Sequence, residues 1–141
     1  MLRKITIIYL TFIYYTQVNA QISSQKQQFL LFWRSDCEVC HIAIPQLVKK
    51  IERLDSNKFT ITAISFDTDS SNYYKAVKEL SMQNFVLKYN FKEGYAGNQL
   101  AKKYHITKTP TLIYINEQGD MLAEGNEAFK ILSGFKKPPI A

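Results

Sequence analysis

The two cysteines of this chain lie between a run of apolar residues and a helical pattern, and this junction limits the folds open to the chain. Residues 29–33 (Phe-Leu-Leu-Phe-Trp) form an unbroken apolar run of strand length, which is typical of a strand buried on both faces. Cys37 and Cys40 follow after a short polar break. Beyond them, apolar residues recur at helical spacing, at Ile44, Leu47, Val48, Ile51 and Leu54. A buried strand that leads directly into an amphipathic helix predicts an α/β fold with both thiols at the junction.

The rest of the chain continues this alternation of strand and helix patterns. The expected elements are a strand at 59–66, a helix around 73–80, a short edge strand or extended loop at 85–91, a helix around 96–104, a strand at 111–115, a hairpin that begins at the turn 116–120, and a last helical turn at 128–135. The chain has 141 residues, with only 5 glycines and 4 prolines to break it into segments. This pattern predicts one domain, an α/β sandwich in which helices flank a mixed sheet.

The first 20 residues have the pattern of a secretory signal. Two basic residues, Arg3 and Lys4, precede a short, mostly apolar stretch at 5–15, and the small side chain of Ala20 suits a signal peptidase. We therefore expect cleavage after Ala20, which leaves one domain at 21–141 and lowers the formal net charge from +6 to +4. An uncleaved membrane anchor is the alternative, although the apolar stretch is short for a span. The protein is accordingly expected outside the cytoplasm, in the periplasm or secreted.

The basic residues are not arranged as a nucleic-acid-binding surface. Lysine pairs at 49–50, 102–103 and 136–137 are scattered along the chain. A nucleic-acid footprint requires clustered basic residues with interleaved aromatic residues. We therefore expect no nucleic-acid partner.

Cys37 and Cys40 form a C-x-x-C pair that allows four kinds of site. A structural disulfide is the simplest, but a bridge that closes so short a loop stabilises a fold little. With His41 the pair completes C-x-x-C-H, the attachment motif for c-type haem. The second iron ligand would then be Met82, His105 or Met121. Zinc is a third candidate, although a structural zinc site normally has a second pair of ligands. The fourth is a reversible dithiol–disulfide couple, because backbone N–H groups at a helix N-terminus stabilise a thiolate.

The segment around the cysteines resembles the active site of the thioredoxin superfamily. Its landmarks are Phe32 and Trp33 at the end of the strand, the C-x-x-C pair after three intervening residues, and Pro45 five residues after the second cysteine. A second landmark, Lys108-Thr109-Pro110-Thr111, is similar to the cis-proline loop of that family. The signal segment, the glutamate within the cysteine motif and an extra helix and strand at about 70–92 make the chain most similar to the TlpA/ResA-like exported thiol–disulfide oxidoreductases.

This resemblance covers about residues 28–126 and implies a thioredoxin-like sandwich with a TlpA-like helix and strand insertion. The chain departs from the family at both ends. Residues 21–28 are too few for the β-hairpin that usually precedes the first matched strand, and the tail after Ala128 is short for the usual final helix. We therefore expect a sheet with an open edge, or an edge completed by a partner.

The resemblance also implies a role for each residue near the cysteines. Cys37 would attack a client disulfide and Cys40 would resolve the mixed disulfide, so that no cofactor is needed beyond this redox-active pair. Asp67, which follows the second strand, is the candidate acid for the proton of Cys40, with a capping or loop role as the alternative. The residues expected to bind the client are Trp33, Asp36, Glu38, Val39, Thr109 and Pro110. The expected partners are a client protein with a disulfide or dithiol and an upstream thiol electron donor.

The charges beside Cys37 bear on the direction of electron flow. Asp36 and Glu38 oppose a thiolate there, whereas Arg34 and His41 favour it. Strong oxidants are proteins whose thiolate is strongly stabilised, and these opposed charges give no such bias. We therefore expect a reductant or a mild oxidoreductase. The alternative is a binding module with the thioredoxin fold and little redox activity.

Overall fold

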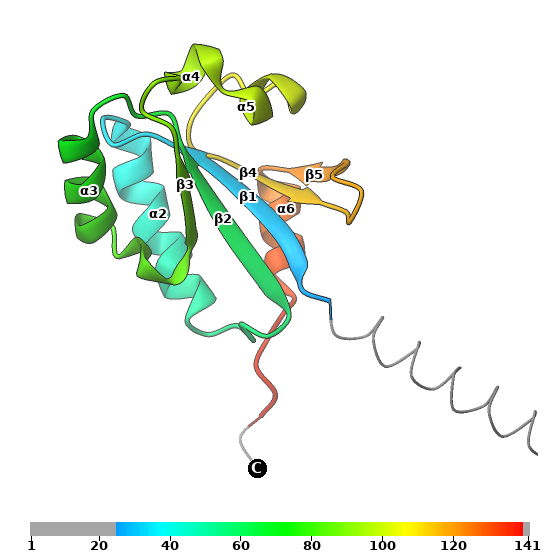
Figure 1. Cartoon of the computed structure of the whole chain (residues 1–141). Helices are drawn as coiled ribbons and strands as arrows, with labels where there is room; N and C mark the ends of the chain where they lie inside the picture. The colour runs from blue at the N-terminus through cyan, green and yellow to red at the C-terminus, as the bar shows by residue number, and fades with distance from the viewer. Residues whose placement is uncertain (1–24, 140–141) are drawn as a thin grey trace, which may run out of the picture.

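The computed structural model describes residues 25–139 and contains a five-stranded sheet with helices on both faces (Figure 1). The strands are β1 (Gln27–Trp33), β2 (Phe59–Ser65), β3 (Val86–Tyr89), β4 (Thr111–Ile115) and β5 (Met121–Glu124). Their order across the sheet is β3-β2-β1-β4-β5, so that β1 is central. The expected signal segment at 1–20 lies outside the described residues.

The unbroken apolar run predicted to be a buried strand is β1. It pairs in parallel with β2 and antiparallel with β4, which makes the sheet mixed. Phe29, Leu31 and Trp33 pack into the core on one face of the sheet, whereas Leu30 and Phe32 pack into the core on the other. Because successive side chains of a strand point to opposite faces, a central strand covered on both sides needs apolar residues at every position.

Helices cover both faces of this sheet. They are α2 (Glu38–Ile51), α3 (Ser70–Glu79), α4 (Gly94–Gly97), α5 (Gln99–Lys103) and α6 (Asn126–Ser133), with a short 3-10 helix η1 (Met82–Asn84). On one face, α2, α3 and α6 pack through buried residues that include Ile44, Tyr73 and Leu132. On the other face, α5 packs through Ala101 and Tyr104. The predicted sandwich of a mixed sheet between helices is confirmed.

Helix α2 carries the cysteines at its start and is shorter than the apolar pattern predicted. It ends at Ile51, and Leu54 instead forms an isolated β-bridge with Lys136. Leu54 is nevertheless buried in the same core as the helix, which explains why the pattern of apolar residues runs past the helix end. Pro45 lies inside α2, where its ring removes one backbone hydrogen bond.

The helix predicted around 96–104 is two short helices, α4 and α5. Asn98 separates them with an extended backbone and caps the second, because its side chain accepts a hydrogen bond from the backbone N–H of Ala101 at 3.0 Å. A residue with a short polar side chain at this position offers the backbone an alternative to helix continuation.

The extra helix and strand predicted at about 70–92 are α3 and β3. Strand β3 pairs in parallel with β2 and forms one edge of the sheet, while β5 forms the other. The last helical turn expected at 128–135 is α6, which begins at Asn126, has 8 residues and buries Ala128 and Leu132 in the core. A partner at either edge of the sheet stays a prediction. No helix within residues 25–139 is long and apolar enough to cross a membrane.

Candidate active site

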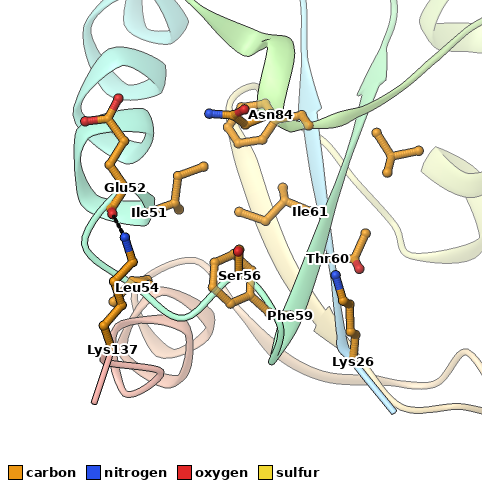
Figure 2. A pocket seen from close by; sticks show the side chains of 12 residues that line it. Lys26, Ile51, Glu52, Leu54, Ser56, Phe59, Thr60, Ile61, Asn84 and Lys137 are labelled. Atoms are coloured by element: carbon orange, nitrogen blue, oxygen red, sulfur yellow. Dashed lines mark hydrogen bonds between the residues drawn. The ribbon is translucent and has the colours of Figure 1, made fainter. Parts of the chain in front are cut away.

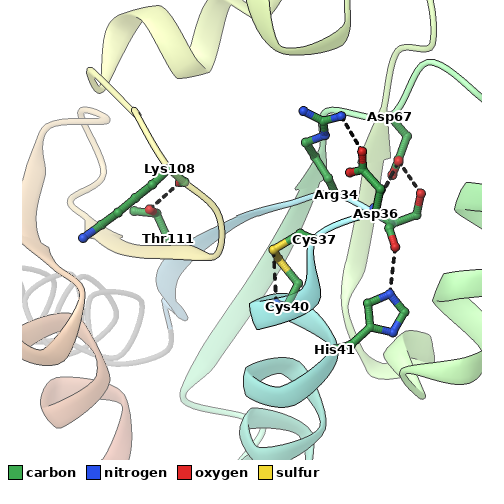
Figure 3. The surroundings of a disulfide bond; sticks show 9 residues. Arg34, Asp36, Cys37, Cys40, His41, Asp67, Lys108 and Thr111 are labelled. Carbon is green, nitrogen blue, oxygen red and sulfur yellow. Dashed lines mark hydrogen bonds and ion pairs between the residues drawn. A yellow bond between two sulfur atoms is a disulfide. The ribbon is translucent and has the colours of Figure 1, made fainter.

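Cys37 and Cys40 are joined by a disulfide at the N-terminus of α2 (Figure 3). Cys37 is the N-cap residue, and its Sγ accepts a hydrogen bond from the backbone N–H of Cys40 at 3.1 Å. Cys37 is partly exposed, whereas Cys40 is completely buried. A molecule that approaches from solvent therefore meets the sulfur of Cys37, where the helix N-terminus also stabilises negative charge.

The residues on either side of Cys37 present charged and apolar side chains to solvent. Arg34 and Asp36 form an ion pair of 2.7 Å, and their side chains are 45% and 65% exposed. Glu38 is exposed and has no ion-pair partner among residues 25–139. Val39 is 60% exposed. Three of the predicted client-binding residues thus lie at the surface beside Cys37.

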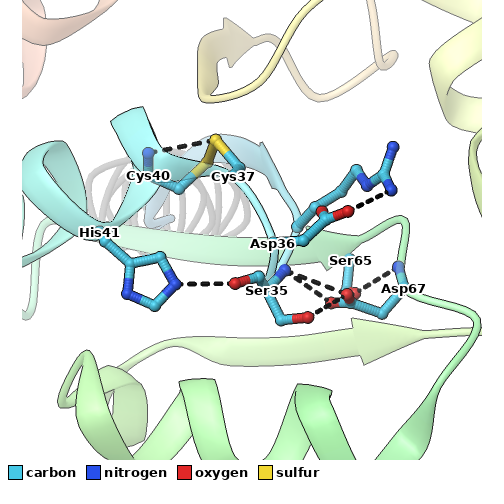
Figure 4. A network of polar contacts seen from close by, with 8 residues as sticks. Ser35, Asp36, Cys37, Cys40, His41, Ser65 and Asp67 are labelled. Carbon is cyan, nitrogen blue, oxygen red and sulfur yellow. Dashed lines mark hydrogen bonds and ion pairs between the residues drawn. A yellow bond between two sulfur atoms is a disulfide. The ribbon is translucent and has the colours of Figure 1, made fainter.

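Asp67 lies two residues beyond the end of β2, and its buried carboxylate binds the loop that precedes Cys37 (Figure 4). The backbone N–H of Ser35 donates to both carboxylate oxygens, at 3.0 and 3.1 Å, and the Ser35 hydroxyl donates to Oδ1 at 2.5 Å. The Ser65 hydroxyl donates to Oδ2 at 2.6 Å. Asp67 is 7% exposed and does not cap a helix, since the N-cap of α3 is Asp69.

His41 binds the same loop from the helix side. Its Nε2 lies 2.7 Å from the backbone carbonyl oxygen of Ser35. Because a carbonyl oxygen only accepts, Nε2 carries the proton and donates it. Every polar group of Ser35 is therefore bonded: the N–H and the hydroxyl to Asp67, and the carbonyl to His41. We call Ser35, His41, Ser65 and Asp67 the Ser35 network.

Sequence reasoning missed the two serines of this network. Each is a single polar residue near the end of a buried strand, and such residues are common where strands run into loops. What brings them together is the register of β1 and β2, in which Trp33 lies opposite Ser65. The carboxyl ends of two adjacent parallel strands meet at one edge of the sheet, so Ser35, Ser65 and Asp67 become neighbours.

The loop that contains Pro110 lies beside the cysteines in Figure 3. The Thr109–Pro110 peptide bond is cis, and the Thr111 hydroxyl donates to the Lys108 carbonyl oxygen at 2.8 Å. Pro110 also lines a hollow of about 310 Å³ between α2 and the start of α6. Other residues that line this hollow are Ala43, Ile44, Leu112, Gly125 and Phe129. Phe129 is 39% exposed, and the lining is mostly apolar, with Gln46 and Asn126 as its polar members.

Trp33 does not lie where a client could contact it. The side chain is completely buried, its Nε1 has no hydrogen-bond partner, and its ring lies 5.7 Å from that of Tyr73. The Tyr73 hydroxyl is also buried without a partner. Burial is the main cause that raises the pKa of Tyr73 to about 12, and the nearby Tyr89, Tyr74 and Asp67 raise it further. Trp33 therefore belongs to the core behind the disulfide, because β1 directs it to the face that α3 covers.

A second hollow, of about 440 Å³, lies at the opposite end of the sheet (Figure 2). Phe59 at the start of β2 and Ile51 at the end of α2 line it, and Lys26 and Lys137 lie at its rim. Lys137 Nζ donates to the carbonyl oxygen of Glu52 at 2.7 Å. The cysteines follow the end of β1 and begin α2, so this hollow is not part of their site.

The haem and zinc alternatives have no support in this geometry. The two sulfur atoms that a haem would need are bonded to each other, and the His41 ring that would bind iron contacts Ser35. Within residues 25–139, no three His, Cys, Asp or Glu side chains gather in a way that could hold a metal ion. The arrangement favours a dithiol–disulfide couple.

Comparison with known families decides the fold family. A family model described as thioredoxin-like matches residues 25–121. The chain belongs to the thioredoxin-like family. No protein with a curated description matches the chain in sequence.

Solved structures of thiol–disulfide oxidoreductases have the same fold. The C-terminal domain of such a protein from Bacteroides thetaiotaomicron is 25% identical, with a TM-score of 0.66, and the match covers 79% of this chain and 78% of that one. A thiol–disulfide oxidoreductase from Bacteroides fragilis is also 25% identical, with a TM-score of 0.60 and coverage of 74% and 77%. StoA from Bacillus subtilis is similar in fold, at 21% identity, a TM-score of 0.58 and coverage of 71% and 72%.

These matches confirm the resemblance to the thioredoxin superfamily. They also confirm the expected enzyme class, a thioredoxin-like thiol–disulfide oxidoreductase, whose members use a redox-active disulfide.

Proposed function

We propose that the protein is an exported oxidoreductase that reduces disulfides in client proteins through Cys37 and Cys40. The observation that carries this proposal is the unequal exposure of the two sulfurs: Cys37 is partly exposed at the N-cap of α2, whereas Cys40 is completely buried one turn further on. A purely structural disulfide does not need one accessible sulfur and one protected sulfur. An enzyme that forms and then resolves a mixed disulfide needs both.

The reaction proceeds in two exchange steps from the dithiol form. The Cys37 thiolate attacks one sulfur of the client disulfide, which forms a mixed disulfide and releases the other client sulfur as a thiolate that takes up a proton. The Cys40 thiol then loses its proton and attacks Cys37 Sγ, which forms the Cys37–Cys40 disulfide and releases the second client thiol. The client gains two electrons and two protons, and an upstream thiol donor returns them to the protein.

Asp67 is our candidate for the group that accepts the proton of Cys40. Its carboxylate is buried, and the Ser35 hydroxyl that donates to it belongs to a residue that is only half buried. A proton on Asp67 could therefore exchange with solvent through Ser35. This role depends on the position of Asp67 after β2 and on its contact with the loop before Cys37.

The client is proposed to lie across Cys37 toward Pro110. The backbone of Thr109 would pair with an extended client segment, as a strand adds to an exposed edge. The hollow that Pro110 lines would take an apolar client side chain, and Asp36, Glu38 and Val39 would contact the segment on the near side of Cys37. Trp33, which is buried, would support this surface from below.

The charges around Cys37 favour reduction or mild exchange over strong oxidation. The Arg34–Asp36 ion pair leaves little net charge beside Cys37, and Glu38 adds a negative one. The thiolate thus gains its stabilisation chiefly from the helix N-terminus, and Glu38 opposes it.

Export is proposed on the basis of the segment at 1–20. One protein of similar fold, from Mycobacterium tuberculosis, is described as a secreted disulfide oxidoreductase, at 19% identity and a TM-score of 0.57. Mass spectrometry of the protein recovered from outside the cytoplasm tests this part. We expect a chain that begins at Gln21, and an intact Met1 in the membrane fraction would favour an anchor instead.

The exchange itself is tested by trapping. The reduced Cys40→Ala variant is incubated with insulin, a substrate with accessible disulfides, and adducts are identified by mass spectrometry under non-reducing conditions. We expect a mixed disulfide on Cys37, because the second step cannot occur. The matched Cys37→Ala variant should form none. Equal adducts on both variants, or none on either, would contradict the assignment and favour a binding module.

A further inference from the structure

Ser35 is held from two sides of the active-site loop, and this arrangement is not explained by the exchange chemistry alone. Asp67, at the end of β2, binds its N–H and hydroxyl. His41, in the first turn of α2, binds its carbonyl oxygen. The loop between β1 and α2 is thereby tied both to the sheet and to the helix, two residues before Cys37.

Cys37 depends on this loop for its position at the N-cap. Its Sγ must stay near the backbone N–H of Cys40, which donates to it at 3.1 Å. In the oxidised protein the disulfide itself fixes Cys37 to α2. Reduction removes this covalent bond. The contacts of Ser35 with Asp67 and His41 then hold the loop to the sheet and to α2.

We propose that His41 is a positioning residue for Cys37, which acts through the carbonyl of Ser35 and matters more in the dithiol form than in the disulfide form. This proposal rests on the proposed function of Cys37 as the attacking thiol. It assigns His41 a role other than the iron ligand that the C-x-x-C-H motif suggested. The ring donates to a carbonyl in both its neutral and its protonated form, so the contact does not need the positive charge of the ring.

The free energy involved follows from the kind of contact. A single hydrogen bond between a side chain and a backbone carbonyl contributes about 0.5–1.5 kcal/mol, which corresponds to a change of about two- to thirteenfold in an equilibrium constant. If the hydrogen bond from His41 to Ser35 stabilises the dithiol form more than the disulfide form, its loss makes the dithiol form less stable. It also lowers the fraction of Cys37 present as thiolate.

Electrostatics gives a competing explanation, which the experiment must separate from positioning. His41 lines a polar hollow of about 320 Å³ together with Asp36, Lys75 and Glu79, and Arg34 and Glu38 also lie close to Cys37. A change at any of these charged groups would alter the thiolate fraction directly.

Three variants separate the two explanations. His41→Ala removes the contact and the charge. His41→Gln keeps an N–H donor of similar reach without the charge. Lys75→Gln removes a positive charge in the same hollow, and Lys75 contacts only Glu79, at 3.9 Å, among the ion pairs between residues 25–139.

The readouts are the rate at which iodoacetamide alkylates Cys37 in the reduced protein at fixed pH, and the reduction potential in glutathione buffers. We expect His41→Ala to slow alkylation about three- to tenfold and to make the potential more negative by up to about 30 mV, since a tenfold change in the equilibrium constant is 29.6 mV for two electrons. His41→Gln should stay close to the wild type, and the melting temperature of the oxidised protein should change little in either variant.

Each other outcome has a definite meaning. If His41→Gln slows alkylation as much as His41→Ala, or if Lys75→Gln has the same effect, charge explains the result and the positioning role is wrong. If His41→Ala matches the wild type, the contact is incidental. If the wild-type protein itself shows no reversible couple, the proposed function fails, independently of His41.

Discussion

The two sides of the disulfide differ in kind. On the side of α3, polar groups surround the loop before Cys37, and the Ser35 network satisfies the donors and acceptors that the loop presents. On the side of α6, the surface is hollowed and mostly apolar, with Pro110 and Phe129 in its lining and Gln46 and Asn126 as its polar members. Under the proposed function, the polar side would hold the loop before Cys37 in place, and the apolar side is where a client side chain would bind.

This contrast is typical of a site that must be rigid and accessible at once. Buried hydrogen bonds to a carboxylate fix a loop because each donor would lose free energy if it were left unpaired. The surface of an apolar hollow is unfavourable in water, so covering it with an apolar side chain of a client lowers the free energy. Substitutions on the two sides should therefore affect different properties of the protein.

The largest effect is expected at Asp67. Asp67→Ala leaves the N–H and hydroxyl of Ser35 and the hydroxyl of Ser65 without their acceptor, so we expect the free energy of unfolding to fall by about 2–4 kcal/mol. Urea unfolding of the oxidised protein measures this change in the free energy of unfolding. Asp69→Ala is the matched control, since this exposed aspartate caps α3 and its loss should cost about 1 kcal/mol. If the two variants lose the same free energy of unfolding, the Ser35 network stabilises the fold no more than an exposed helix cap does.

Tyr73, in the core behind the loop, should make the stability of the protein depend on pH. Burial raises the pKa of Tyr73 to about 12, so the unfolded chain loses the phenol proton near pH 10 while the folded protein keeps it. The free energy of unfolding should therefore fall between about pH 10 and 12, by up to about 2–3 kcal/mol from this residue.

The Tyr73→Phe variant isolates that contribution. It should be as stable as the wild type or more stable at neutral pH, because it removes a buried hydroxyl that has no partner. It should also lose less stability than the wild type in urea unfolding between pH 9 and pH 11.5. The same pH dependence in both proteins would show that Tyr73 is not shielded from water as the structure places it.

On the apolar side we expect a loss of client reaction without a loss of stability. Ala43→Phe fills part of the hollow beside Pro110, so kcat/KM for reduction of a protein disulfide should fall about tenfold, equivalent to about 1.4 kcal/mol. The rate with a small-molecule disulfide should stay unchanged. Ala96→Phe, the same substitution at an exposed position of α4, is the control and should alter neither rate. A fall in both rates after Ala43→Phe would mean that the substitution disturbs the cysteines themselves.

The smallest effect concerns the exposed ion pair beside Cys37. Arg34→Gln should change the free energy of unfolding by less than about 0.5 kcal/mol, because both partners are solvated. It should nevertheless slow alkylation of Cys37 about two- to threefold, since the negative charge of Asp36 is then uncompensated. The Arg34→Lys variant keeps the charge and should alkylate at the wild-type rate. Faster alkylation in Arg34→Gln would show that Arg34 does not stabilise the Cys37 thiolate.

The sequence predicted those parts of the molecule that depend on local patterns. The apolar run of β1, the periodic face of α2 and the cysteine pair between them are visible within a single stretch of chain, and the family resemblance rests on them. The Ser35 network is different, because Ser35 and Asp67 are 32 residues apart and meet only through the register of two parallel strands. A loop serine carries no signal of that register.

The expectation for Trp33 shows a second limit. An aromatic residue next to an active-site loop suggests contact with a client, but the alternation of side chains along β1 decides which face it takes. Trp33 follows Phe29 and Leu31 into the core that α3 covers, where it packs on Tyr73. Trp33 is closed to solvent because α2, α3 and α6 cover this face, and the local sequence around Trp33 does not show where those helices pack.

The thiol–disulfide equilibrium of the purified protein in glutathione buffers, followed by mass spectrometry after the free thiols are blocked, tests whether Cys37 and Cys40 form a reversible couple. We predict one reversible two-electron transition between the Cys37–Cys40 disulfide and the dithiol, at a potential well below the value of about −120 mV found for the strongest oxidants of this kind. The absence of a reversible transition would show that the Cys37–Cys40 disulfide is structural and would contradict the proposed exchange reaction. A midpoint near about −120 mV would show that the protein oxidises its clients instead of reducing them.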